Sequence, residues 1–427
     1  MQIHVVQPGQ SLFAIAQVYS TTPTALASAN QLNPNQSLVV GQSLVIPIAG
    51  MYYWVQAGDS LFTIARRFNT TPRALARANR IQLTQSLMPG FRIYIPSLPK
   101  RSAEFNAYVE ARNEASAQSL KKYVQEAAPR LTYLAPFSFE IQRDGSLKPP
   151  ILDDFPSIAT QNGVVTMLVV TNKEQDQFSP ELSHVFLTNN EIQNKLLDNV
   201  IATAKRLGLR DIHWDIEHVL PSDREAYNAF LRKAADRIHG EGFLMSTALA
   251  PKVSDQQQGE WYTAHDYAAH GRVADFVVIM TYEWGYSGGP AMPVSPIDQV
   301  EKVIRYAMTK MPASKILMGQ NLYGYDWTLP FVQGSVAKAV SPQEAIDVAR
   351  RYNVPILYDP KAQAPHFGYS DEQGKRHIVW FEDARSIQAK FNLVKRLGLR
   401  GMSYWKLGLE FPQNWLLIDD NFNVLKK

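Results

Sequence analysis

Two regions of the chain differ in how apolar and polar residues alternate. Up to about residue 97, short apolar segments flank short stretches of helical periodicity. From residue 103 onward, compact runs of apolar and aromatic residues are separated by longer amphipathic stretches, in which apolar positions recur every three or four residues. The pattern therefore predicts a small N-terminal part and a large C-terminal domain of alternating strands and helices.

Eight apolar runs in the C-terminal domain predict β-strands, and the stretches between them predict helices. The strands are expected at residues 105–109, 131–136, 164–170, 211–216, 244–248, 276–282, 316–322 and 401–405. The helices are expected at residues 115–128, 190–207, 223–239, 296–310 and 384–397. Such alternation favours a parallel sheet covered by helices, and eight units fit a (β/α)8 TIM barrel. The predicted fold class is α/β.

One stretch of this domain does not fit the alternation. Between Trp327 and about Phe381 no barrel strand is expected, although residues 354–358 and 377–380 have strand-like character. We predict a small α+β insertion at about residues 328–380. It would lie between the seventh and eighth strands of a barrel domain that spans residues 103–427.

The N-terminal part is a duplication. Gly9 and Gly58, like Pro47 and Pro96, are 49 residues apart, so the repeat has no internal insertion. Each copy predicts a strand, a glycine turn, a helix capped by serine, a second helix that begins with proline, and a closing strand. The strands are expected at residues 4–7 and 43–47, and at residues 53–56 and 92–96. Each copy is predicted as a βααβ unit.

Both copies resemble the LysM module, over residues 2–48 and 51–97. The resemblance implies binding to glycans that contain N-acetylglucosamine, such as peptidoglycan or chitin, between the first strand–helix loop and the loop before the last strand. By that resemblance the groove residues are Gly9, Gln10, Ser11 and Leu12 with Leu38 and Val39, and Gly58, Asp59, Ser60 and Leu61 with Leu87 and Met88. The same residues could instead only cap and pack the helix. Two weak sites on one chain would increase retention on a polymer.

Residues 211–217 are the strongest candidate for a chemical site. Alternate residues of a strand point to the same side, so Asp211, His213, Asp215 and Glu217 share one face and apolar residues share the other. Ionisable groups inside a barrel are costly unless they are paired or used in catalysis, and barrel enzymes act at the carboxyl ends of their strands. A buried structural charge network is the alternative interpretation.

This row resembles the fourth-strand signature of glycoside hydrolase family 18, Asp-x-x-Asp-x-Asp-x-Glu. The resemblance implies a retaining, substrate-assisted mechanism, in which Glu217 is the general acid and Asp215 orients the acetamide of the substrate. Arg210 and His213 depart from the signature, which has Asp at the first position and Asp or Asn at the second. We expect His213 to hydrogen-bond Asp215 and keep it ionised, with Asp211 as a further supporting residue. A satisfied core histidine is the alternative.

Further segments agree with this resemblance. Residues 280–283 resemble the family's Met-x-Tyr-Asp motif, which implies that Tyr282 hydrogen-bonds the acetamide and that Glu283 replaces the aspartate. Trp405 matches the tryptophan that forms the floor of the sugar subsite, and an indole stacks well on the apolar face of a sugar. The remaining substrate-binding candidates are Met280, Trp284, Asn321 and Tyr323.

Over its whole length the chain is similar to the LysM-containing spore cortex-lytic N-acetylglucosaminidases of Bacillus and relatives. Residues 131–138, 280–296, 381–386 and 404–408 carry this similarity. It implies cleavage of cortex peptidoglycan fragments after N-acetylglucosamine, and a location in the spore coat, the cortex or the cell wall. A chitinase and a non-catalytic lectin are the alternatives, and the retained Glu217, Asp215 and Tyr282 argue against the lectin.

Composition narrows the set of partners. A net charge of +4 without a block of Lys or Arg argues against nucleic acid. No apolar run is long enough to span a bilayer, and no secretion signal is recognisable at the N-terminus. The chain has no cysteine, which excludes disulfides and thiolate ligands, and no cluster of His, Asp and Glu has metal-ligand spacing. We therefore expect no metal and no cofactor; the oligomeric state stays open.

Overall fold

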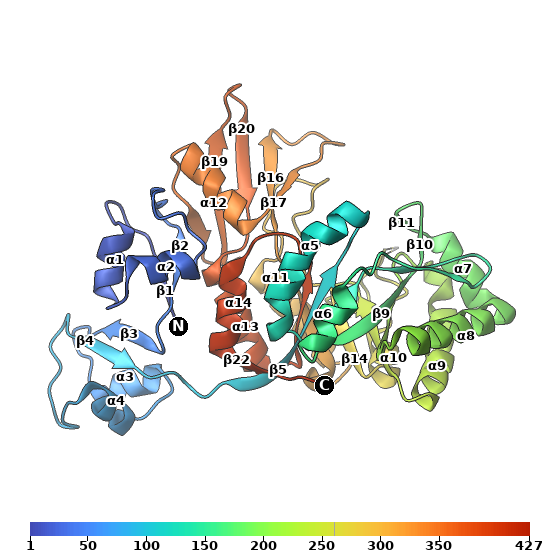
Figure 1. Ribbon diagram of the computed structural model, residues 1–427, viewed down its shortest axis with the longest axis horizontal. Coiled ribbons are helices and arrows are strands. Elements are labelled where there is room, and N and C mark those ends of the chain that lie inside the picture. Colours follow the sequence, from blue (N-terminus) through green and yellow to red (C-terminus); the bar gives the residue numbers. More distant parts are fainter. Residues whose placement is uncertain (260) are drawn as a thin grey trace.

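In the computed structural model, which describes residues 1–259 and 261–427, eight parallel strands close into a barrel (Figure 1). Around the ring β5 is followed by β6, β9, β12, β13, β14, β15 and β21, and β21 pairs with β5. The strands are β5 (Arg101–Val109), β6 (Tyr133–Pro136), β9 (Val165–Thr171), β12 (Asp211–Asp215), β13 (Leu244–Leu249), β14 (Phe276–Ile279), β15 (Ile316–Asn321) and β21 (Gly401–Trp405). All eight predicted barrel strands are confirmed.

Short strands extend this sheet. They are β7 (Phe139–Ile141), β8 (Leu147–Lys148) and β22 (Phe422–Val424), and a separate hairpin of β10 (Lys173–Glu174) and β11 (Gln177–Phe178) comes after β9 in the chain. The hairpin lies just beyond the carboxyl end of β9, and its residues are therefore placed at the end of the barrel where barrel enzymes act.

Helices cover the outside of the barrel. They are α5 (Glu114–Ala127), α6 (Phe155–Gln161), α7 (Pro180–Thr188), α8 (Asn190–Leu207), α9 (Arg224–Gly240), α10 (Tyr267–Val273), α11 (Ile297–Met308), α13 (Ala384–Leu397) and α14 (Pro412–Asn421). The predicted bounds of α8 and α13 hold because both helices have strong end signals. Asn189 and Asp383 cap their starts, and Gly208 and Gly398 end them in the left-handed conformation. The periodicity misses α6, α7, α10 and α14, which are too short to repeat it clearly.

Packed apolar layers lie on both sides of the barrel strands. Outside, Ile212 and Trp214 of β12 belong to a buried cluster, with Trp214 edge-on against Phe230 of α9 at 5.0 Å between ring centroids. Inside, a smaller cluster includes Tyr133 and Phe276, whose rings are 4.9 Å apart. The barrel interior is therefore a packed core and not a pore.

A five-stranded antiparallel sheet stands between β15 and β21, where the sequence predicts an α+β insertion (Figure 1). Its order is β17 (Lys338–Val340), β16 (Gly324–Leu329), β20 (Arg376–Trp380), β19 (Ala364–Ser370) and β18 (Leu357–Asp359), with α12 (Pro342–Arg351) packed on it. This insertion begins at Gly324, earlier than residue 328, because Tyr325 and Trp327 pair with β20 and do not form a loop.

Each N-terminal repeat folds as the predicted βααβ unit. Module 1 consists of β1 (Gln2–Val5), α1 (Leu12–Val18), α2 (Pro23–Ala29) and β2 (Ser43–Ile46). Module 2 consists of β3 (Met51–Trp54), α3 (Leu61–Arg67), α4 (Pro72–Asn79) and β4 (Arg92–Ile95). Ser11 and Ser60 accept the expected capping hydrogen bonds at 3.2 Å. The first strand of each unit begins and ends earlier than predicted.

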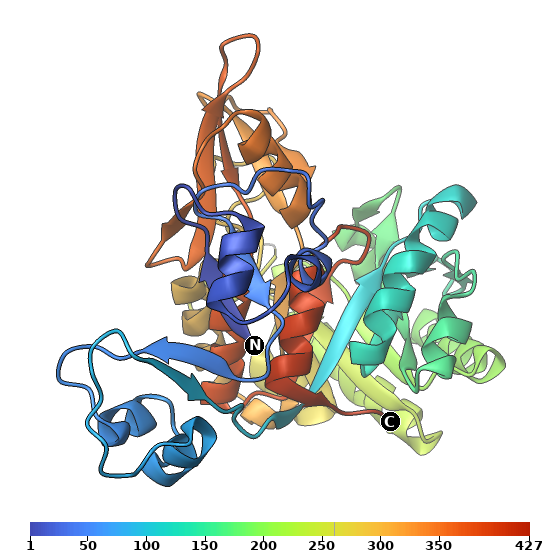
Figure 2. The same ribbon diagram turned by 60° about the vertical axis from the view of Figure 1, so that its left-hand side comes forward.

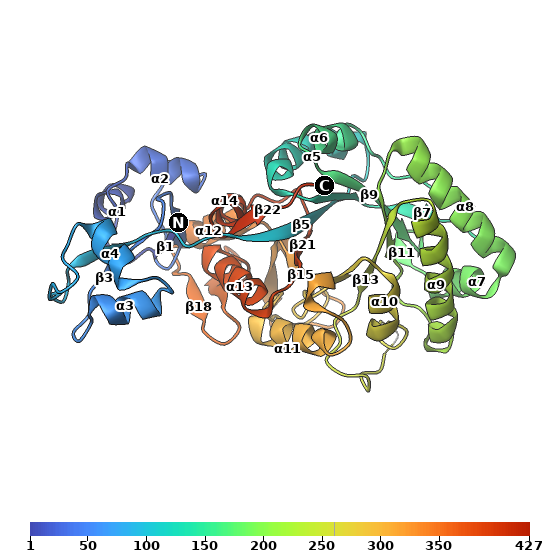
Figure 3. The same cartoon turned by 90° about the horizontal axis from the view of Figure 1, so that it is seen from below.

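The two modules lie at the same side of the barrel. Figure 2 shows module 1, in dark blue, in front of the insertion and of the red C-terminal helices, whereas module 2 projects to the side. Seen from below, both modules lie beyond one side of the barrel, next to α13 and α14, and β5 runs from them into the barrel (Figure 3). None of the helices in the described ranges is long and apolar enough to cross a membrane.

Candidate active site

The polar face of β12 points into the barrel. Asp211 and His213 are completely buried, Asp215 is 4% exposed, and Glu217 follows the carboxyl end of the strand. Trp214, from the alternate face, packs under the helices. The two faces are therefore arranged as the alternation predicts, and the ionisable row ends where β12 opens to the loops.

A hydrogen-bond chain ties His213 to neighbouring strands. Ser246 of β13 donates to Asp211 Oδ1 at 2.6 Å, so the Nδ1–H of His213 donates to Ser246 Oγ at 2.8 Å. His213 Nε2 then accepts from the Tyr108 hydroxyl at 2.8 Å. Burial lowers the pKa of His213 to about 3, so the ring is neutral. The prediction that His213 hydrogen-bonds Asp215 is wrong, because Tyr108 and Ser246 are the partners of the two ring nitrogens.

Asp215 is buried and Glu217 is partly buried at the end of β12. Burial raises the pKa of both carboxyls, and the charge of Asp215 raises the pKa of Glu217 further. Two influences oppose these shifts. The Trp261 indole N–H donates to Glu217 Oε2 at 2.5 Å, and the positive charge of Lys173 lowers the pKa of both carboxyls. The net effect lets Glu217 keep its proton near neutral pH, as a general acid must.

Two buried side chains hold the backbone around Glu217. Asn172, directly after β9, accepts from the Glu217 N–H at 3.0 Å and donates to the Glu217 carbonyl at 2.7 Å. His265 Nδ1 accepts from the Ala250 N–H, so its Nε2–H donates to the carbonyl of Ile216 at 3.0 Å. These contacts fix the point from which the Glu217 side chain extends.

The segment after β14 brings an aromatic and an acidic side chain to the same end of the barrel. Tyr282 is 7% exposed and belongs to a cluster against which Trp261 packs, the residue that hydrogen-bonds Glu217. Its pKa is raised first by burial and then by the charges of Asp215 and Glu217. Met280 is buried in the same cluster as Tyr282. Glu283 has a left-handed backbone (φ 66°) and accepts hydrogen bonds from the hydroxyls of Tyr323 and Tyr325.

A cleft of about 830 Å³ opens at this end of the barrel, and its lining includes Trp405, Glu283, Tyr323 and Lys173. Trp405 is held edge-on against Phe137 at 4.9 Å between ring centroids. Lys173 relates the cleft to the β12 carboxyls. It lines the cleft, and its positive charge lowers the pKa of Asp215 and of Glu217.

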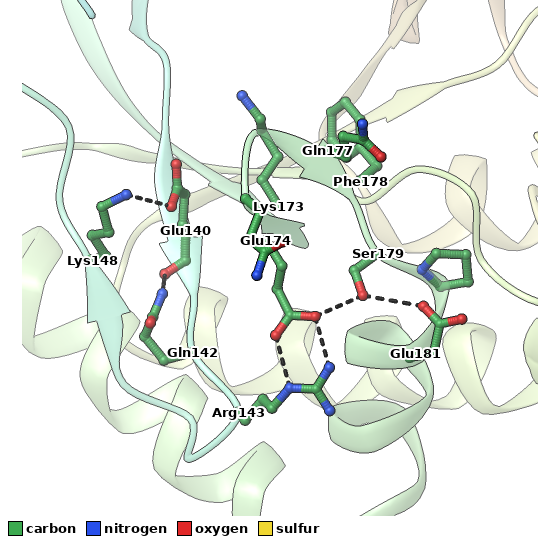
Figure 4. A pocket seen from close by; sticks show the side chains of 12 residues that line it. Glu140, Gln142, Arg143, Lys148, Lys173, Glu174, Gln177, Phe178, Ser179 and Glu181 are labelled. Atoms are coloured by element: carbon green, nitrogen blue, oxygen red, sulfur yellow. Dashed lines mark hydrogen bonds and ion pairs between the residues drawn. The ribbon is translucent and has the colours of Figure 1, made fainter.

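A second cavity of about 660 Å³ continues past Lys173 (Figure 4). In that view, the ammonium of Lys173 points away from the ion pair of Arg143 with Glu174. The distance from Arg143 Nε to Glu174 Oε1 is 2.8 Å. The two cavities share Glu140, Lys148 and Lys173 among their lining residues. The two cavities therefore adjoin each other at these residues.

Some candidates lie away from the cleft. Trp284 packs against the main apolar cluster of the barrel, because the left-handed residue before it redirects the chain. Asn321 is buried and hydrogen-bonded to Gln320 and to the carbonyl of Tyr323. Neither side chain is among the residues that line the cleft, and the same holds for Asp215, Glu217, Met280 and Tyr282. Within the described ranges, no group of three or more His, Asp or Glu side chains could hold a metal ion.

In the N-terminal modules, the predicted groove residues divide into core and surface. Leu12 and Leu61 are buried in the module cores, which supports the packing interpretation for these two. Gln10 and Asp59 close their loops, since the side chain of each accepts from the backbone N–H three residues earlier. The glycines and serines of the loops stay at the surface or partly exposed.

Trp261, Asn172 and His265 are not predicted by the sequence. Each contacts the end of β12 from a loop more than forty residues away along the chain. A polar residue just after a barrel strand, as Asn172 is, was the one available signal, since such positions face the site in barrels.

The chain is similar to known proteins over its whole length. It matches the model of glycosyl hydrolases family 18 over residues 107–410 and that of the LysM domain over residues 4–47 and 53–96. It is 59% identical to the cortical fragment-lytic enzyme of Bacillus subtilis (strain 168), over 100% of this chain and 99% of that relative. The crystal structure of the Bacillus megaterium QM B1551 spore cortex-lytic enzyme SleL matches with a TM-score of 0.92 and 52% identity, over 100% and 99% of the two chains. A chitinase structure from Chromobacterium violaceum shares the fold, with a TM-score of 0.68 and 24% identity over 74% of this chain and 98% of that one.

Proposed function

Since the chain belongs to family 18 of the glycosyl hydrolases and carries two LysM domains, we propose that this glycoside hydrolase cleaves spore cortex peptidoglycan fragments after N-acetylglucosamine. The name of the 59% identical relative, which matches over the full length, supports this substrate. We place its action in the spore coat, the cortex or the cell wall. The observation that carries the proposal is the pair of carboxyls at the carboxyl end of β12, the buried Asp215 and the partly buried Glu217, both with raised pKa values.

Glu217 is the general acid. It protonates the glycosidic oxygen while the C1–O bond breaks, and the carbonyl oxygen of the substrate's own 2-acetamido group attacks the anomeric carbon. Glu217, now ionised, then takes a proton from the water that opens the resulting oxazolinium ion, so that the configuration is retained. Burial supports this role, because a raised pKa lets Glu217 hold its proton until the leaving oxygen takes it.

Asp215 and Tyr282 orient the acetamide. Among the described residues, Asp215 Oδ1 has no hydrogen-bond partner, so it can accept from the acetamide N–H. As a carboxylate, Asp215 also balances the positive charge of the oxazolinium ion. The Tyr282 hydroxyl, near both carboxyls, donates to the acetamide oxygen. This scheme needs an N-acetyl group, so plain glucans are not substrates.

Reducing-end release from purified cortex fragments and from chitooligosaccharides tests the substrate. We expect kcat/KM to be at least about tenfold higher on the cortex fragments, equivalent to about 1.4 kcal/mol of transition-state binding. The shared fold does not decide the matter, because a chitinase has it too. Preference for chitin oligomers would support the chitinase alternative. Binding of both substrates without cleavage of either would identify the barrel as a lectin.

The pH profile of wild-type kcat/KM should be bell-shaped and displaced upward from the range of ordinary carboxyls. Activity needs protonated Glu217 and ionised Asp215, so it falls as pH rises through one pKa and as pH falls through the other. Burial raises both pKa values, so both limbs should lie above the ~4 of exposed carboxyls. Initial rates from roughly pH 3 to 10 at constant ionic strength measure the limbs.

The Trp261→Phe variant tests whether the alkaline limb belongs to Glu217. The indole N–H of Trp261 lowers the pKa of Glu217, so removing the indole should move the alkaline limb to higher pH. A wild-type alkaline limb near pH ~4, or a limb that stays in place in Trp261→Phe, would contradict the role of Glu217.

The Asn172→Ala variant should lower kcat by about tenfold with a smaller change in KM, because Glu217 loses the two hydrogen bonds that position its backbone. The free energy of unfolding should also fall by about 1–3 kcal/mol, since buried partners are left unsatisfied. Steady-state kinetics and denaturant unfolding measure the two effects. Asn162→Ala, which removes a hydrogen bond to the Ile158 carbonyl at the C-terminal end of α6, is the matched control and should leave kcat unchanged. Equal loss of kcat in both variants would reduce Asn172 to a structural role.

A further inference from the structure

The two LysM modules are sequence duplicates, so equivalent positions can be compared directly. The loop before the last strand, which forms one wall of the predicted groove, has different surroundings in the two modules. Val39 of module 1 is 6% exposed, whereas Met88, its equivalent in module 2, is 78% exposed. All four residues of β2 are buried, whereas β4 alternates between exposed and buried positions.

The insertion covers this loop of module 1. Val39 belongs to the same buried cluster as Ile346 and Ile356 of the insertion, and the Ile356 N–H donates to the Val40 carbonyl at 2.9 Å. The approach is close. A Cβ atom on Gly41 would lie 1.8 Å from the Ile356 carbonyl oxygen, so only glycine fits there.

Polar contacts complete the docking of module 1. Arg350 of α12 donates to the Ser37 carbonyl at 2.8 Å, and Arg385 of α13 donates to the Gly41 carbonyl at 3.0 Å. Gln413 of α14 donates to the Ser43 carbonyl at 2.9 Å. Gln413 also donates to the buried side chain of Asn30 in module 1. Module 1 is therefore packed on the barrel and its insertion like a part of the same domain.

Module 2 has none of these contacts within the described residues. A Cβ atom on Gly90, the equivalent of Gly41, would meet nothing within 4 Å. Among the described residues, the hydrogen bonds of module 2 to other parts of the chain involve module 1 and the linker. The Gln2 side chain accepts from the Tyr52 N–H and donates to the Tyr52 carbonyl. Arg92 donates to the Val18 carbonyl and to Ser20, and Tyr94 donates to the Ala49 carbonyl. Its groove wall is open to solvent.

We propose that the two modules have different roles, an inference that rests on the proposed peptidoglycan substrate. Module 2 binds the N-acetylglucosamine-containing glycan, with Leu87 and Met88 against the apolar faces of the sugars. Module 1, whose groove wall is closed by the insertion, is a structural part of the catalytic domain. It positions module 2 beside that domain. Retention on the polymer therefore depends on one site and not on two linked sites.

Cosedimentation of the full-length chain with insoluble peptidoglycan sacculi tests this division. All variants carry Glu217→Gln, which stops hydrolysis during binding. Leu38 and Leu87 are equivalent leucines and both are half-buried, so Leu38→Ser and Leu87→Ser remove similar packing. We expect Leu87→Ser, like Met88→Ser, to weaken retention by about tenfold and Leu38→Ser by less than about twofold. Equal losses from the two leucine variants, or no loss from the module 2 variants, would overturn the inference.

The same experiment separates this inference from the proposed function. Cleavage of soluble cortex fragments by the wild type reports the substrate, whereas retention of the inactive Glu217→Gln variants reports only binding by the modules. Binding to chitin in place of sacculi would overturn the proposed substrate, while the leucine comparison could still be read on chitin. Retention on neither material would overturn the inference, whatever the activity.

The docking itself is tested by Gly41→Ala and Gly90→Ala. Both glycines have φ 83°, so both substitutions introduce the same backbone strain, but only the first clashes with Ile356. The melting temperature should fall by about 5 °C more in Gly41→Ala than in Gly90→Ala. Equal shifts would show that module 1 is not held by the insertion.

Discussion

Replacing Glu217 with glutamine should reduce kcat on cortex fragments by about a thousandfold, within the range that general acid–base catalysis contributes. Glutamine has nearly the same shape, and its amide oxygen can still accept the Trp261 N–H. It has no proton for the leaving oxygen, however, and it cannot deprotonate the attacking water. Steady-state kinetics measure the loss, and thermal unfolding should show no destabilisation, because burial disfavours the ionised carboxyl that is removed.

Glu126→Gln is the matched control for this variant. Burial raises the pKa of Glu126 too, but the residue lies on α5 outside the cleft, where it contacts Gln31. We expect its kcat to stay within about twofold of the wild type, since surface changes away from a site have small effects. A Glu217→Gln variant that kept more than about a tenth of the wild-type kcat would show that another group protonates the leaving oxygen.

The barrel could be predicted from the sequence because its signals are local. Strands buried on both faces give continuous apolar runs, and capped amphipathic helices give a clear period. The bounds of α8 and α13 follow from single capping residues such as Asn189 and Asp383. The short helices were not predicted, because a helix of seven residues, such as α6, is too short to show a helical period.

The site was predictable only where its residues are neighbours in the sequence. The row on β12 and the segment at residues 280–283 have a spacing that can be recognised. The partners of that row depend on which loops meet in space. Asn172 and Trp261 contact Glu217 across 45 and 44 residues of chain, and no local pattern encodes such contacts.

The environment of His213 shows the same limit. Alternation predicts that this ring faces the barrel interior, but it cannot say which side chain stands opposite. The partners, Tyr108 and Ser246, come from two other strands, 105 and 33 residues away. The docking of module 1 is equally hidden, because the sequences of the two modules match while only one is covered by Ile356 and Gln413.

The Asp215→Asn variant should lower kcat by a factor of about a hundred or more and also move the alkaline limb of kcat/KM to lower pH. The loss of rate follows because the oxazolinium ion loses its compensating charge. The shift follows because the charge of Asp215 raises the pKa of Glu217, and a neutral amide removes that contribution. Burial remains, so the limb should still lie above the range of exposed carboxyls.

Asp211→Asn distinguishes a specific coupling from a general effect of the buried row. Asp211 lies on the same face of β12 and burial raises its pKa to about 7, but its charge is not among the influences on the pKa of Glu217. Its substitution should therefore leave the alkaline limb in place.

An alkaline limb that moved equally in Asp211→Asn and Asp215→Asn would show that the pKa of Glu217 responds to the summed charge of the β12 row and not to Asp215 specifically. Loss of rate in Asp215→Asn without any shift would mean that Asp215 acts through hydrogen bonding alone and carries no charge beside Glu217. Only the two effects together require one ionised Asp215 that both stabilises the intermediate and keeps the acid protonated.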